Sequence, residues 1–369
     1  MHPKKNIEKY TALFASIEVL VSNAKTKVAQ TVNQTIIHTY WHIGQHIVEY
    51  EQKGKERAEY GTKLLKRLSE DLTKAFGKGY SWRNLQRFKK FYELFPIVPT
   101  LSAQLENQKG QPLVAKSKNS KGQTLSAQSV NTKLQTAITK LSWSHFVRLL
   151  SVKNEDERSF YMIETAENNW SVRELDRQIN ASLFERLLLS KDKKAVKELA
   201  EKGQLIANQN DLLKDPLVLE FLDLKEPHTY SENDLETAII DNLGDFLLEL
   251  GKGFSFVARQ KRISAGSDHF YIDLVFYNRL LKCHVVIDLK IGKLKHQDIG
   301  QMQMYVNYYD REIKLEDENL TIGIILCKEQ NDFVIEYSLP KENSQIFSKE
   351  YQLYLPNKKE LKALLNQYL

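Results

Sequence analysis

Two aspartates and a lysine in the C-terminal third of the chain have the residue types and spacing that phosphodiester chemistry needs. Fifteen positions separate Asp273 from Asp288, and Lys290 follows the second aspartate at i+2. Both aspartates lie in apolar, strand-like runs, and antiparallel strands joined by residues 278–282 would bring the two carboxylates side by side. Residues i and i+2 of a strand share a face, so Lys290 would point the same way as Asp288. Carboxylates bind hard divalent cations and an ammonium group offsets negative charge, so the pattern predicts magnesium-dependent phosphodiester hydrolysis.

Several neighbouring side chains could support this chemistry. Glu236 lies in the first turns of the helix expected before the strands, where it could face the metal. Arg259 and Gln260 could contact the scissile phosphate or its surroundings. Because adjacent strand residues alternate faces, at most one of them should point to the site, and we favour Gln260. Gln301 and Tyr305 share a helical face at i and i+4.

A basic rim for a phosphate chain is expected just after the second acid. Its members are Lys290, Lys293, Lys295 and His296. Each group also has an ordinary structural interpretation: strand aspartates often end strands, Lys290 could be a plain ion-pair partner, and Glu236 could complement a helix dipole. The apolar residues that flank both aspartates favour the functional interpretation.

Composition sets broad limits on the class of protein. The chain has 369 residues, a net charge of +6 and 27% charged residues, which fits two or three domains and a nucleic-acid partner without establishing one. Its two cysteines, Cys283 and Cys327, have no zinc-ligand spacing. No apolar run approaches the length of a membrane span, so we expect a cytoplasmic protein with no membrane partner.

The N-terminal region is predicted to be helical, as a domain over residues 1–190. Apolar residues recur at three- and four-residue steps from Asn6 to Glu51, and a second helix should run from about Gly61 to Phe76. Ser81 could cap a further helix through Phe95. That helix could be the recognition helix of a helix-turn-helix, or a solvated helix of a bundle. Its candidate DNA-contacting residues are Arg83, Asn84, Arg87, Lys89 and Lys90.

A polar insertion interrupts this region at about residues 99–139. The pentapeptide Thr-Leu-Ser-Ala-Gln occurs there twice, which indicates a local duplication in a mobile surface loop. Helical periodicity resumes at Ser142, and a capped helix is expected over Val172–Leu189. Residues 191–230 are interpreted as a connector.

The remainder, residues 231–369, is expected to form an αβββαβ domain, so the fold class is α+β. A helix over Leu235–Leu250, closed by Gly251, precedes three strands. Those strands are expected at Phe254–Arg262, Phe270–Tyr277 and Cys283–Ile291. The later elements are expected at Gln297–Tyr309 (helix), Thr321–Cys327 (strand), Phe333–Tyr337 (edge strand) and from Lys358 (helix).

The stretch from Leu235 to Lys328 resembles a PD-(D/E)XK nuclease domain of the YhcG type. The segments that carry the resemblance are Phe256–Gln260, Tyr271–Tyr277, Asp288–Gly292 and Gly300–Met302. The N-terminal part is similar to the helical domain fused to it in that family, through Gly79–Leu85 and Leu141–His145. Only the polar insertion lacks a counterpart.

The resemblance implies a restriction-endonuclease-like core and metal-dependent DNA cleavage. Carried over, Asp273 and Asp288 would bind one or two Mg²⁺ ions, for which Mn²⁺ could substitute, and Lys290 would be the catalytic lysine. Glu236 and Gln301 would be supporting groups, Glu236 near the metal. The chain departs from the family pattern at Ile272, where proline is expected, and at Asp288, where most relatives have glutamate; metal preference or rate could therefore differ.

Two alternatives stay open from the sequence. One is a DNA-binding or regulatory protein with a nuclease fold and weak or absent activity. The other is a structure-specific junction resolvase, and such enzymes often work as homodimers. No coiled-coil heptad that would set the oligomeric state is identified, and neither the DNA sequence cleaved nor the biological role follows from the sequence.

Overall fold

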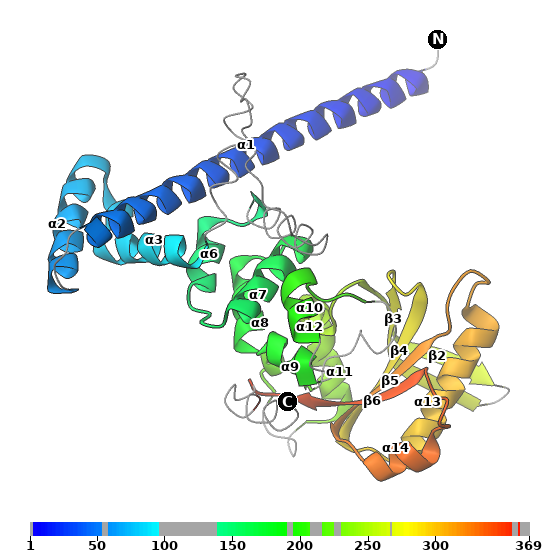
Figure 1. The fold of residues 1–369 in the computed structure, drawn as a ribbon. Helices are drawn as coiled ribbons and strands as arrows, with labels where there is room; N and C mark the ends of the chain where they lie inside the picture. The colour runs from blue at the N-terminus through cyan, green and yellow to red at the C-terminus, as the bar shows by residue number, and fades with distance from the viewer. Residues whose placement is uncertain are drawn as a thin grey trace, which may run out of the picture. The chain divides into compact units, whose positions relative to one another are not determined.

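The structure, a computed structural model, describes residues 3–53, 58–95, 139–189, 195–206, 216–224, 230–265, 268–355 and 361. The chain divides into two compact units, Met1–Leu175 and Asp176–Leu369 (Figure 1). The domain boundaries expected at residues 190 and 231 stay predictions. The duplicated polar insertion lies outside the described residues, apart from Thr139, and so does nearly all of the helix expected from Lys358.

Unit 1 is helical, as expected. A 51-residue helix, α1 (Pro3–Lys53), spans the whole first apolar pattern. The other helices are α2 (Ala58–Phe76), α3 (Trp82–Leu94), α6 (Trp143–Leu149), α7 (Glu155–Asn168) and the start of α8 (Val172–Asn180), with a 3₁₀ turn at Lys78–Tyr80.

The apolar faces of α1, α2 and α3 meet in one core. Ile47, Leu65, Leu85 and Phe88 are buried there, and the Tyr40 ring stacks on Phe88 at 4.1 Å between centroids. Ser81 occupies the N-cap position of α3, but its side chain makes no capping hydrogen bond. The helix therefore starts at the predicted place because its apolar face is buried, without help from the cap.

The helix expected over Val172–Leu189 is in fact two helices, α8 (Val172–Asn180) and α9 (Leu183–Leu189). Ser182, between them, has φ of 53°, which a continuous right-handed helix does not allow. The predicted start is confirmed, because the Glu174 backbone N–H donates to Ser171 Oγ at 3.3 Å.

Unit 2 contains a six-stranded mixed sheet in the order β1-β6-β5-β4-β3-β2 among the described residues. The strands are β1 (Leu217–Val218), β2 (Phe254–Ala265), β3 (Asp268–Asn278), β4 (Cys283–Lys293), β5 (Ile322–Glu329) and β6 (Ile346–Gln352). The pairs β2–β3 and β3–β4 are antiparallel, and β4–β5, β5–β6 and β1–β6 are parallel. Its helices are the end of α8, α9, α10 (Ala195–Lys202), α11 (Glu232–Asp241), α12 (Leu243–Leu250), α13 (His296–Tyr308) and α14 (Asp332–Ser338), with a 3₁₀ turn at Glu220–Leu222 and a π-helical turn at Tyr309–Ile313.

Helices cover both faces of the central strands (Figure 1). One face buries Leu274, Ile287 and Leu289 against α11 and α12. The other buries Val275 and Val286 against α13. The predicted order of helix, three strands, helix and strand is confirmed, and strands buried on both faces explain the nearly continuous apolar runs.

Two predicted elements differ from the structure. The helix expected over Leu235–Leu250 breaks at Asn242, whose side-chain amide donates to the Ala238 carbonyl at 3.0 Å and whose φ is −113°. The prediction of an edge strand at Phe333–Tyr337 is wrong, because this segment lies in helix α14. The strand of this region is β6, which follows the helix. Asn331 caps α14 by accepting from the Val334 N–H, and this local cap favours a helix over a strand.

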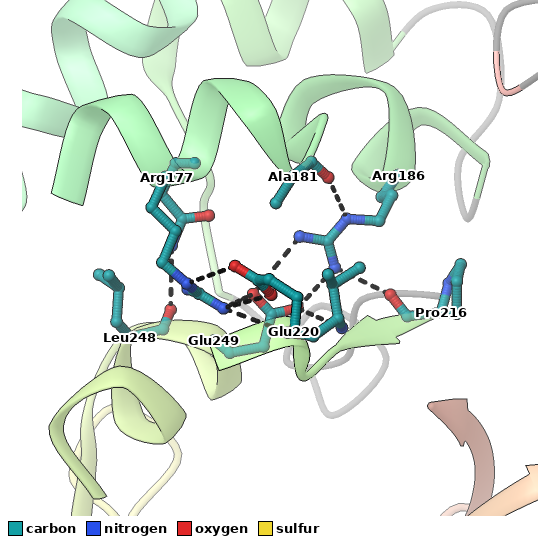
Figure 2. Close-up of polar contacts among 9 residues, drawn as sticks. Arg177, Ala181, Arg186, Pro216, Glu220, Leu248 and Glu249 are labelled. Atoms are coloured by element: carbon teal, nitrogen blue, oxygen red, sulfur yellow. Dashed lines mark hydrogen bonds and ion pairs between the residues drawn. The ribbon is translucent and has the colours of Figure 1, made fainter. Parts of the chain in front are cut away.

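A buried ionic cluster joins α9, β1 and α12 within unit 2 (Figure 2). Arg186 Nη1 lies 2.5 Å from Glu249 Oε1, and both side chains are fully buried. Arg186 also donates to the carbonyls of Ala181 and Pro216, and Glu249 accepts from the Val218 N–H at 3.0 Å. These contacts attach α9 and the short strand β1 to the helix that precedes the site strands.

Candidate active site

The two aspartates face each other where β3 and β4 stop pairing. The last opposed pair of this ladder is Leu274 with Ile287, so Asp273 and Asp288 occupy the next opposed position. Asp273 Oδ2 accepts from the Leu289 backbone N–H at 2.8 Å. The carboxylate therefore replaces a backbone acceptor at the point where the strands separate, which holds it beside the second acid.

Strand alternation places the acids and the lysine on one face. Val275 and Val286, each two residues from an aspartate, both belong to the core beneath α13. Lys290 Nζ lies 2.7 Å from Asp288 Oδ2, which confirms directly that these two side chains point the same way.

Asp288 is the least solvated of these groups. Its side chain is 3% exposed, and Oδ2 has the Lys290 ion pair but no hydrogen bond of acceptable geometry to the described residues. Burial raises the pKa of Asp288 to about 7, and the neighbouring Asp273 adds to the rise while Lys290 opposes it. Burial alone would lower the pKa of Lys290, but Asp288, Glu232 and Asp273 together raise it, so the ammonium keeps its charge.

This donor set fits a hard divalent cation. A buried carboxylate whose negative charge is poorly compensated gains from a cation beside it, and Asp273 supplies a second oxygen ligand nearby. Among the residues that the structure describes, no group of three or more His, Cys, Asp or Glu side chains is arranged to hold a metal. Mg²⁺ does not need such a cage, because it is usually held by one or two carboxylates together with water and substrate phosphate.

Glu236 contacts the site through other side chains. It is buried in α11 and accepts from Arg259 Nε at 2.9 Å and from Gln260 Nε2. Gln260 Nε2 also lies 3.0 Å from Asp273 Oδ1, so Gln260 bridges the two carboxylates. Arg259 reaches Glu236, whereas Gln260 reaches both Glu236 and Asp273, and the preference for Gln260 over Arg259 at the site stays a prediction. Gln260 has φ of 46°, which interrupts the regular strand alternation on which that prediction depended.

Gln301 and Tyr305 of α13 lie beside the acids. Gln301 donates to Tyr305 Oη, and Tyr305 Oη donates to the Tyr271 carbonyl at 2.7 Å. Burial raises the pKa of Tyr305, and the charges of Asp288 and Asp273 raise it further. This face of α13 is therefore turned towards the acid pair. The hydrogen bond from Gln301 orients the Tyr305 hydroxyl. The catalytic role of Gln301 stays a prediction.

Two lysines of the expected basic rim, Lys293 and Lys295, take part in contacts within unit 2. Lys293 is exposed but forms an ion pair with Glu329, at the irregularity in β4 between Lys290 and Lys293. Lys295 precedes the first residue of α13, and its backbone N–H donates to Asp298 Oδ2 at 2.8 Å. The DNA-binding role of both lysines stays a prediction.

In unit 1, helix α3 buries Leu85, Phe88 and Phe91 and presents basic residues on its opposite face. Asn84 has a structural task, because it donates to the Gly79 carbonyl at 2.9 Å and accepts from Arg87 at 3.2 Å. Lys89 pairs with Glu51. Arg83, Arg87 and Lys90 are exposed, and their DNA-binding role stays a prediction.

Sequence reasoning missed Glu232. Its Oε2 lies 3.8 Å from Lys290 Nζ, one helical turn before Glu236 on α11. The i, i+4 spacing of the two glutamates was the available signal, since residues so spaced share one face of a helix.

Comparisons with known proteins agree with this geometry. Residues 210–366 match the family described as the YhcG PDDEXK nuclease domain, and residues 16–130 and 97–186 match the DUF1016 N-terminal domain. The chain is 41% identical over 355 residues to a relative named "Putative nuclease YhcG" from Escherichia coli (strain K12), covering 95% of this chain and 92% of the relative. A solved structure titled as a repair endonuclease from Pyrococcus abyssi aligns at 22% identity and a TM-score of 0.25, over 36% of this chain and 50% of that one.

The family matches together span most of the chain, and the six-stranded sheet lies within the segment that matches the PDDEXK nuclease domain. The acids and the lysine expected from the resemblance lie together on that sheet. This chain belongs to the YhcG family, in which a helical DUF1016 N-terminal domain is joined to a PDDEXK nuclease domain.

Proposed function

We propose that this protein is an endonuclease that hydrolyses DNA phosphodiester bonds with the help of Mg²⁺, or of Mn²⁺ in its place. The observation that carries the proposal is the buried Asp288 carboxylate, with Asp273 opposite and the Lys290 ammonium at 2.7 Å. Burying two acids and one cation together costs stability, so such a cluster indicates a functional site. Its charges suit a phosphate that binds together with a divalent ion.

Asp273 and Asp288 would hold the ion, with Glu236 close by through Gln260. When bound, the ion would lower the pKa of a water molecule and would place a positive charge opposite the phosphate oxygens. Lys290, which keeps its proton, donates hydrogen bonds to the attacking water or to a non-bridging phosphate oxygen and offsets the charge that develops there. The Gln260 bridge holds the Asp273 carboxylate in a fixed orientation while the Leu289 N–H holds its other oxygen.

The exposed basic residues of α3 would contact the DNA backbone or base edges, as in a helix-turn-helix protein. No described helix has both the length and the apolar character that crossing a membrane requires. Cys283 and Cys327 are both buried free thiols, which fits a reducing compartment, and we place the protein in the cytoplasm on that ground.

A plasmid-nicking assay with Mg²⁺ tests the proposal. The wild type should nick supercoiled DNA, and Asp288→Ala and Lys290→Ala should each lower the rate by about 100-fold or more, because each removes charge from the reacting centre. Lys341→Ala is the control: it removes the same charge from an exposed lysine in the turn before β6, outside every candidate site residue, and should stay within about threefold of wild type.

Chelation of divalent ions should stop nicking by the wild type, and circular dichroism should show that each variant is folded. Equal nicking by the wild type and the Asp288→Ala variant would contradict the proposal. The activity would then come from a contaminant, and a DNA-binding protein with a nuclease fold would be favoured.

A further inference from the structure

The N-terminal half of α1 is an apolar helix that no described residue covers. From Tyr10 to Val32 every side chain that the structure describes is exposed, and the first buried residue of the helix is Ile37. Within unit 1, α1 extends well beyond α2 and α3 (Figure 1). The large apolar side chains on this half include Tyr10, Leu13, Phe14, Ile17, Leu20 and Val21, which are 48–68% exposed.

These side chains follow a coiled-coil spacing. Tyr10, Phe14, Ile17, Val21, Ala24 and Val28 are separated by alternating steps of four and three residues; we call them the α1 seam. Steps of this kind place an apolar stripe along one face that wraps a second helix. The sequence alone did not single out this heptad pattern, because the same helix also carries the apolar residues that pack on α3.

The charge of this segment is unusually low for an exposed helix. Between Tyr10 and Val32 the charged residues are Glu18, Lys25 and Lys27. A helix that stays in water normally has a charged face, and a contiguous exposed apolar patch marks an interaction site. The partner should therefore present a matching apolar face with few charges.

A second copy of the same segment meets that requirement. The seam has five large apolar side chains, and Leu13 and Leu20 flank it. Covering roughly 80 Å² on each of these seven side chains, on both chains, removes about 1,100 Å² from water, which is near the lower end of the range of stable interfaces. The face is self-complementary, as a two-fold interface requires, and symmetric pairs are the commonest oligomers.

The charges favour an antiparallel arrangement. If Val21 lies opposite Ala24 of the partner subunit, the same register places Glu18 next to Lys25 of the partner subunit, and the two-fold axis repeats that ion pair. A parallel pair would place Leu13 of the partner subunit beside Glu18, with no opposite charge. Flanking charges of this kind set the orientation of coiled coils more than their stability.

We propose that this protein self-associates through an antiparallel pairing of the α1 seam with the α1 seam of a second copy. The pairing is independent of the nuclease chemistry and would remain if the active site were inactivated. It removes the exposed apolar stripe from water over about 39 Å of helix, the length of residues 10–35 at 1.5 Å per residue.

Sedimentation equilibrium of the full chain tests the pairing. The wild type should have the mass of two chains at micromolar concentration, and the double variant Ile17→Glu/Val21→Glu should have the mass of one. Val19→Glu is the matched control, because Val19 is also apolar and 58% exposed but lies off the seam, and it should remain a dimer. A single-chain mass for the wild type, or dissociation by the control, would overturn the proposal. Circular dichroism should be unchanged, since all three sites are exposed.

Cysteine cross-linking tests the direction. The antiparallel register places Phe14 opposite Thr31 of the partner subunit, so Phe14→Cys and Thr31→Cys variants should form disulfide-linked dimers only when mixed. A parallel pair would instead link each variant to itself and would overturn the antiparallel arrangement. The native cysteines are both buried, which keeps the background low.

Discussion

The charged form of the Asp288 side chain is unfavourable in the metal-free protein, but that same charge is what a divalent ion would bind. The strand places its carboxylate beneath α13, where burial and the neighbouring Asp273 oppose its ionisation and Lys290 supports it. A carboxylate in this position holds its charge best when a cation is present. The same environment that weakens the metal-free protein would therefore strengthen its binding of a divalent ion.

The raised pKa of Asp288 predicts how stability changes with pH when no metal is present. Because burial raises this pKa from 3.8 to about 7, the folded state holds the proton more tightly than the unfolded state. The stability from this group is fully present below about pH 3.8 and is lost as the pH rises through about 7. Relative to Asp288→Asn, the wild type should lose on the order of a few kcal/mol of unfolding free energy between about pH 5 and 8.

Urea denaturation in chelator at about pH 5, 6.5 and 8 measures this difference, since the window spans the raised pKa. Asp268→Asn, which changes an exposed acid on the neighbouring strand, is the control and should show no comparable trend. A wild-type-minus-Asp288→Asn difference that stays constant with pH would contradict the prediction.

At the scale of elements, the strands carry the site and the helices hold the strands in place. The Glu236–Gln260–Asp273 chain connects α11 to β2 and β3, and the Tyr305 hydroxyl connects α13 to β3. Behind them, the Arg186–Glu249 pair connects α9 and α12 (Figure 2). Each link joins residues distant in the chain, so a substitution in one element should alter the position of side chains in another.

Breaking the buried pair should destabilise unit 2 strongly. Glu249→Ala would leave the fully buried Arg186 guanidinium without its carboxylate, which should lower the unfolding free energy by about 3–5 kcal/mol. Glu329→Ala is the control, because its ion pair with Lys293 is more than half exposed and its removal should lower stability by about 1 kcal/mol or less. Urea denaturation of the full chain measures both.

The double variant Arg186→Met/Glu249→Leu separates charge from packing. It removes both charges while keeping side-chain volume, so it should recover most of the stability that Glu249→Ala loses. A double variant as unstable as Glu249→Ala would show that the hydrogen bonds of Arg186 and Glu249 to the backbone stabilise the cluster more than the balance of their charges does.

At the scale of the whole molecule, the exposed basic residues of α3 and the acid pair of the sheet belong to different units. In the proposed function, the basic surface on the separate unit would hold the DNA without occupying the reacting centre. Phosphate contacts dominate this kind of binding and release counterions, so its strength depends on salt.

Neutralising the α3 surface should weaken DNA binding. With Arg83→Gln, Arg87→Gln and Lys90→Gln combined, the slope of log affinity against log salt should fall by about one unit for each phosphate that the helix no longer neutralises. The control combines Lys153→Gln, Arg311→Gln and Lys341→Gln, which removes the same charge from exposed sites elsewhere. Fluorescence anisotropy with labelled duplex in chelator measures both slopes, and equal slopes would exclude α3 as the DNA surface.

The sequence by itself determined the order of helices and strands in the nuclease domain and the placement of Asp273, Asp288 and Lys290 on one face. These features depend on periods of two and 3.6 residues, which are local and can be read along the chain. The break at Asn242 and the helix at Phe333–Tyr337 are also local, but there side-chain caps outweighed the apolar pattern.

Only the tertiary structure decided the protonation of Asp288, the bridge of Gln260 from Glu236 to Asp273, and the position of Glu232 beside Lys290. Each of these depends on groups from different elements that approach within a few ångströms. Periodicity places residues on faces, but burial and pairing depend on which faces meet, and that is a property of the folded chain.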